Sequence, residues 1–114
     1  MSIFPDREAA FERKFAHEQE VAFLARMARD RRFGLWAAHM FGIGEAEEED
    51  YARALVNLDL AGKGDEGLIE KVMEDFRRHE MTVPREDIRR ALLKAEAAAH
   101  LQLRNVDGTS VVSR

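Results

Sequence analysis

The chain has 114 residues, 46% of them hydrophobic and 35% charged, with a formal net charge of −4 and no cysteine. This length suits one domain with a modest core, and the acidity argues against nucleic acid or an anionic membrane surface as a partner. The lack of cysteine excludes disulfides, thiolate metal sites and cysteine nucleophiles. Because no apolar run reaches the length of a signal peptide or a membrane span, we expect a cytoplasmic protein that does not insert into the membrane.

The first predicted element is a long helical segment from Pro5 to about Phe41. Pro5 suits the first turn of a helix, because the backbone N–H that proline lacks is not needed there. Only Gly34 weakly interrupts the segment. The pattern predicts either one long helix or two helices joined by a bend.

Two shorter helices are predicted next, each after a glycine-containing break. The helix at about 45–61 opens with acidic side chains, which the positive end of the helix dipole favours. The helix at about 65–80 has Leu68, Val72 and Phe76 at four-residue steps. This spacing is typical of a helix with one buried face.

The last predicted helix begins at Pro84 and continues to about Arg104, after which residues 105–114 lose the helical period. We expect those final residues to form a flexible tail. No segment alternates apolar and polar residues as a strand does. The sequence therefore predicts an all-α protein, a four-helix bundle with a long N-terminal helical arm and a flexible C-terminal tail.

The arm is predicted from a narrow apolar stripe at the start of the first helix. At 100° per residue, one sector of this helix holds Phe4, Phe11, Phe15 and Ala22. From Val21 onward the apolar residues point nearly all round, as in an embedded helix. We therefore divide a single domain, residues 1–104, into an arm at 1–20 and a bundle at 21–104.

Two interpretations of the stripe remain open from the residues alone. In the first, Phe11 and Phe15 cap the end of the bundle, because an apolar stripe is usually part of a core. In the second, the arm is a docking helix that binds in the groove of a partner protein.

Residue patterns typical of catalysis are weak or missing. The spacing G-x-G-x-x-G at residues 62–67 follows a predicted helix instead of a strand, so it indicates a turn and not a dinucleotide site. The three serines lie near the termini, and the four histidines are far apart without metal-ligand spacing. We expect no enzymatic activity, no metal site and no cofactor.

A basic cluster on the first helix includes Arg26, Arg29 and Arg32. These side chains are expected to face solvent or to pair with the acidic second helix. The alternative is a contact with phosphate, which would make the protein a small-ligand bundle that binds ADP or ATP without catalysis.

Three phrases, at residues 6–8, 11–18 and 34–38, resemble the ATPase inhibitor zeta subunits of bacterial F-type ATP synthases. They read Asp-Arg-Glu, Phe-Glu-Arg-Lys-Phe-Ala-His-Glu and Gly-Leu-Trp-Ala-Ala. The resemblance covers nearly the whole chain, to about Leu103. It implies a four-helix bundle that regulates ATP hydrolysis, with Leu35 and Trp36 in the bundle core.

The resemblance also implies a mode of action. The N-terminal helix would wedge between the catalytic alpha and beta subunits and against the central gamma subunit, blocking reverse rotation. The protein would then be cytoplasmic and associated peripherally with the inner membrane through the synthase. The stripe and the matching phrases together give the predicted partner-binding residues: Phe4, Arg7, Phe11, Lys14, Phe15, Ala16, His17 and Glu18.

Overall fold

A computed structural model describes residues 3–106, and the side chains of residues 7–104. It contains four α-helices: α1 (Ile3–Phe41), α2 (Glu45–Leu60), α3 (Gly64–Arg78) and α4 (Arg85–Val106). No strand occurs in this part of the chain. The predicted all-α, four-helix architecture is confirmed. No helix among the described residues is both long enough and apolar enough to cross a bilayer.

The observed helix bounds agree with the predicted ones to within a few residues, and two points are settled. The first segment is one continuous helix of 39 residues, without a bend at Gly34. The last helix continues to Val106, two residues beyond the predicted end. The remainder of the predicted tail, 107–114, lies outside the described residues.

The glycine spacing at residues 62–67 belongs to the connection between α2 and α3, as the sequence predicted. Gly62 and Gly64 have φ angles of 88° and 72°. Residues with a Cβ rarely adopt this left-handed conformation, so glycine suits the tight turn. No strand precedes it, and a dinucleotide-binding loop is therefore absent here.

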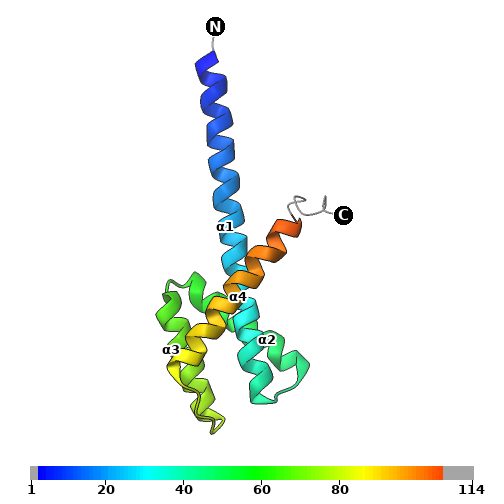
Figure 1. Ribbon diagram of the computed structural model, residues 1–114, viewed down its shortest axis with the longest axis vertical. Helices are drawn as coiled ribbons and strands as arrows, with labels where there is room; N and C mark the ends of the chain where they lie inside the picture. The colour runs from blue at the N-terminus through cyan, green and yellow to red at the C-terminus, as the bar shows by residue number, and fades with distance from the viewer. Residues whose placement is uncertain (1–2, 107–114) are drawn as a thin grey trace.

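The bundle surrounds only the second half of α1. Figure 1 shows α2, α3 and α4 gathered around the C-terminal half of α1, while the N-terminal half projects away from them. The molecule is accordingly elongated, with extents of 68 × 37 × 27 Å. Helix α1 contacts each of the other three helices, so it is the central element of the bundle.

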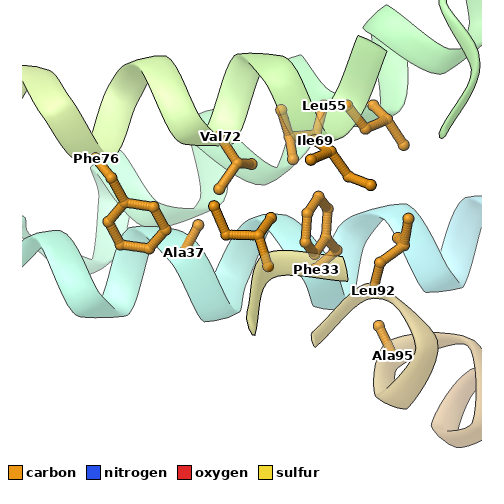
Figure 2. Close-up of a cluster of buried hydrophobic side chains, with 10 residues drawn as sticks. Phe33, Ala37, Leu55, Ile69, Val72, Phe76, Leu92 and Ala95 are labelled. Atoms are coloured by element: carbon orange, nitrogen blue, oxygen red, sulfur yellow. The ribbon is translucent and has the colours of Figure 1, made fainter. Parts of the chain in front are cut away.

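The hydrophobic core is formed by side chains from all four helices (Figure 2). Its buried members are Phe33, Ala37, Leu55, Leu68, Ile69, Val72, Phe76, Ile88, Leu92 and Ala95. Trp36 packs at the edge of this core. Its ring stacks on that of Phe33 with centroids 6.0 Å apart, and it meets the ring of Phe76 edge-on at 5.7 Å.

Small residues let α1 and α2 approach closely. Gly34, Ala37 and Ala38 are all buried, and a Cβ added at Gly34 would lie 2.7 Å from the Cα of Ala52. The phrase at residues 34–38 is therefore a helix-crossing element. The predicted core role of Leu35 and Trp36 holds only in part, because both are half-buried.

The expectation that α1 is embedded from Val21 onward is wrong at its start. Phe23 and Leu24 are exposed, and Ala25 is the first buried residue of α1 among the described side chains. The reason is the length of α1. The three helices that pack on it are much shorter and leave its N-terminal turns uncovered.

Candidate functional site

The surface of interest is the N-terminal part of α1, where two phenylalanines lie in solvent. Phe11 is 71% exposed and Phe15 is 56% exposed. Neither therefore caps the end of the bundle, which excludes the first interpretation of the stripe. Single exposed apolar residues are common on protein surfaces, but two large aromatic rings one turn apart on a projecting helix form a small apolar patch.

The exposed phenylalanines lie on the side of α1 that faces the core further along the helix. Phe15 precedes Phe33 by 18 residues, about five turns of 3.6 residues, so both side chains leave the helix in nearly the same direction. Phe33 is fully buried. The phenylalanine stripe, Phe11 and Phe15, thus continues the core-facing side of α1 beyond the end of the bundle.

The other predicted partner-binding residues share this exposed position on the arm. These are Arg7, Lys14, Ala16, His17 and Glu18, and the side chain of Phe4 lies outside the described residues. The Lys14 ammonium lies 3.7 Å from the Glu18 carboxylate, one helical turn away. Such an exposed pair contributes about 0.3–0.5 kcal/mol to helix stability, which helps an uncovered helix to persist.

The predicted basic cluster lies at the base of the arm, where α1 enters the bundle, and it is engaged in ion pairs. The Arg26 guanidinium donates two hydrogen bonds to Asp59 of α2, at 2.7 and 3.0 Å, and one to Asp65 of α3 at 3.3 Å. Arg29 donates to Asp30 at 2.8 and 3.0 Å and lies 3.0 Å from Asp65. The expected pairing with the second helix is therefore present.

Arg32 is held differently from the other two arginines. Its guanidinium donates to the side-chain oxygen of Gln102 on α4, at 3.0 and 3.2 Å. The three arginines thus link α1 to each of the other helices. Carboxylates surround Arg26 and Arg29 and oppose a phosphate group electrostatically, while binding of ADP or ATP by these residues stays a prediction.

The sequence interpretation missed Asp30, which sits inside the run of arginines. Asp30 is fully buried, and burial raises the pKa of its carboxyl to about 7. The sequence does carry a signal for its burial, because Asp30, Phe33 and Ala37 have the three- and four-residue spacing of one helix face. The hydrogen bonds from Arg26 have the opposite effect on Asp59 and lower its pKa to about 2.

Comparison with known proteins gives a family for the chain. The family model described as ATPase inhibitor subunit zeta matches residues 1–102. No curated protein and no solved structure matches the chain. The matched range includes the projecting arm as well as nearly all of the bundle, and it confirms the resemblance found in the sequence. The chain therefore belongs to the ATPase inhibitor subunit zeta family, and this membership supports a regulatory, non-catalytic role as an ATPase inhibitor that interacts with the ATP synthase.

Proposed function

We propose that residues 1–20, the arm, inhibit ATP hydrolysis by the F-type ATP synthase. The arm wedges between the catalytic alpha and beta subunits and against the gamma subunit, and it blocks rotation in the hydrolytic direction. The observation that carries the proposal is the exposure of Phe11 and Phe15 on a helix that projects from the bundle. A helix that binds in a groove uses apolar anchors three or four residues apart, and Phe11 and Phe15 are four residues apart.

The energy of docking is adequate for such a role. Burying one phenylalanine side chain contributes about 1.5–3 kcal/mol, and most of the surface of Phe11 and Phe15 is available for burial. Residues 3–20 of the arm are already part of a continuous helix, so less conformational entropy is lost on binding than for a disordered segment. To inhibit, the arm binds one conformation of the cycling enzyme better than the others.

The charged residues of the arm have a different role from the phenylalanines. Arg7, Lys14 and Glu18 are exposed beside the stripe, where they form a polar rim that selects the orientation of the helix. Ala16 and His17 leave the helix about 100° and 200° from Phe15, so they lie on the flank and on the far side of α1, where they contact other walls of the crevice. The protein acts by occupancy alone, in the cytoplasm and held near the inner membrane by its partner enzyme.

Hydrolysis of ATP by the catalytic head of the cognate synthase tests the proposal. The head is titrated with the full chain, with a chain that lacks the residues before Glu20, and with the double variant Phe11→Ala/Phe15→Ala. We expect inhibition by the full chain and none by the truncated chain. The double variant should need at least about tenfold more protein, because about 1.4 kcal/mol corresponds to a factor of ten in affinity.

A matched control uses an equally exposed apolar residue of the bundle. Leu93 on α4 is 59% exposed, close to the value for Phe15. Leu93→Ala should inhibit like the natural sequence. Equal loss of inhibition in Leu93→Ala and in the phenylalanine double variant would refute docking through the arm, and so would full inhibition by the truncated chain.

A further inference from the structure

A second feature, independent of the inhibitory arm, is a group of charged side chains where α1 enters the bundle. We call it the buried ion cluster after its three buried members, Arg29, Asp30 and Asp59. Arg26 and Asp65, which are about half exposed, complete it. One carboxylate oxygen of Asp30, Oδ1, accepts both hydrogen bonds from Arg29. The other, Oδ2, is buried and has no hydrogen-bond partner among the described residues. The buried carboxylate of Asp59 lies beside Asp30, because one guanidinium nitrogen of Arg29, Nη2, is 2.8 Å from Asp30 and 3.7 Å from Asp59.

A buried carboxylate oxygen without a partner is unfavourable, and a second carboxylate beside it makes the ionised form more so. One proton on Oδ2 of Asp30 removes both problems. The protonated oxygen donates a hydrogen bond to Asp59, and the neutral Asp30 no longer repels its neighbour. The charges also balance, because two arginines then face two ionised aspartates instead of three.

We propose that Asp30 and Asp59 share a proton and form a pH-sensitive latch that holds α2 against α1 at the base of the arm. With the proton bound, both carboxyl groups are satisfied, by each other and by the two arginines. When the proton is lost, the buried ion cluster holds three carboxylates against two arginines, with an unpartnered oxygen on Asp30, and the joint between α1 and α2 weakens.

Charged groups on α4 also lie near this joint. Glu96 and His100 line a groove together with Arg26 and Arg29, and the two α4 side chains are 4.0 Å apart. Both are about half exposed or more, so solvent screens their effect on Asp30. The partners that face Asp30 inside the protein are therefore those of α1, α2 and α3.

The direction of the pH effect follows from burial of Asp30. Its pKa rises from 3.8 in an unstructured chain to about 7 in the folded protein. The folded state therefore binds a proton that the unfolded state has already released over this range. The stabilisation by the shared proton is fully present below pH 3.8 and is lost as the pH rises through about 7.

A carboxyl titration on the full natural chain tests the proposal directly. The ¹³C chemical shift of each aspartate carboxyl group is followed by NMR from pH 4 to pH 9. We expect Asp30 to titrate near pH 7, with a smaller simultaneous shift at Asp59 because the two groups share the proton. A midpoint for Asp30 below pH 5 would overturn the latch. This readout needs no variant to fold.

Unfolding in urea provides the second test, at pH 5.5 and pH 8.0. In Asp30→Asn the amide oxygen still accepts from Arg29, and the amide nitrogen donates to Asp59 as the protonated carboxyl group would. The amide side chain cannot titrate. Asp50→Asn is the control, because Asp50 is exposed on α2. We expect the unfolding constant of the natural chain and of the control to rise about 30-fold more than that of Asp30→Asn between these pH values. Parallel behaviour of all three proteins would overturn the proposal.

Discussion

Replacing Gly34 by alanine tests whether the close crossing of α1 and α2 matters to the stability of the bundle. Gly34 is buried on the side of α1 that faces Ala52 of α2. The added methyl carbon would lie 2.7 Å from the Cα and 3.3 Å from the Cβ of Ala52. Ordinary carbon contacts are about 3.5–4.0 Å long, and a backbone atom cannot turn aside as a long side chain can. The two helices would have to separate.

Two effects of opposite sign determine the size of the change. Alanine is favoured over glycine in a helix interior by about 1 kcal/mol. Overpacking a tight contact costs about 1–3 kcal/mol, and here it also loosens the neighbouring contacts of Phe33 and Ala37. Because the clash involves backbone, we expect overpacking to win. The two terms give a net loss of about 0–2 kcal/mol in the free energy of unfolding, and the backbone clash places Gly34→Ala in the upper half of this range.

Urea unfolding followed by circular dichroism measures this change. Thermal unfolding gives a second measure, because in a domain of this size a change of 1 kcal/mol corresponds to about 4–8 °C in the melting temperature. Ala54→Gly, at an exposed position of α2, gives the helix-propensity effect alone. If Gly34→Ala instead stabilised the protein by the amount that Ala54→Gly destabilises it, the close approach would carry no energetic weight and the reasoning would be wrong.

Two further predictions concern the core and the buried ion cluster. Phe76→Ala should lower the free energy of unfolding by about 3–5 kcal/mol in a urea titration, because Phe76 is almost fully buried and contacts Trp36; a loss below 1 kcal/mol would show that the core does not depend on it. Arg26→Ala should lower stability by about 1–3 kcal/mol at pH 7 through loss of the partner of Asp59. Because the pKa of Asp59 is lowered to about 2 in the folded natural chain, its ionised form contributes stability above pH 3.8 that is lost as the pH falls through about 2. Arg26→Ala lacks this contribution, so its free energy of unfolding should fall less than that of the natural chain between pH 5 and pH 2. The same acid dependence in both proteins would contradict the prediction.

The four helices could be predicted because glycine and proline separate segments with a clear helical period. The positions of Pro84 and of the glycines at 42–44 and 62–67 define the ends of the helices to within a few residues. Gly34 was harder to interpret. Glycine in a helical segment suggests a possible bend, but in the structure Gly34 lies inside the continuous helix α1, where Ala52 of α2 packs closely against it.

The limits of sequence reasoning appear where α1 enters the bundle. Phe23 and Leu24 have the periodicity of core residues and are nevertheless exposed, since periodicity does not say where a partner helix ends. Asp30 lies in a run of charged residues, which indicates exposure to solvent, yet it is buried. Only the arrangement of α2 and α3 reveals its carboxylate neighbour, because Asp59 is 29 residues away in sequence.

The continuity of α1 has a mechanical consequence. Because one unbroken helix joins the arm to the bundle, the bundle fixes the rotational phase of the phenylalanine stripe about the helix axis. Each residue of an α-helix turns the chain by about 100°, so one residue added between Glu20 and Ala25 would aim Phe11 and Phe15 away from their present direction without altering either side chain. The bundle thus sets the direction in which the arm presents its aromatic rings.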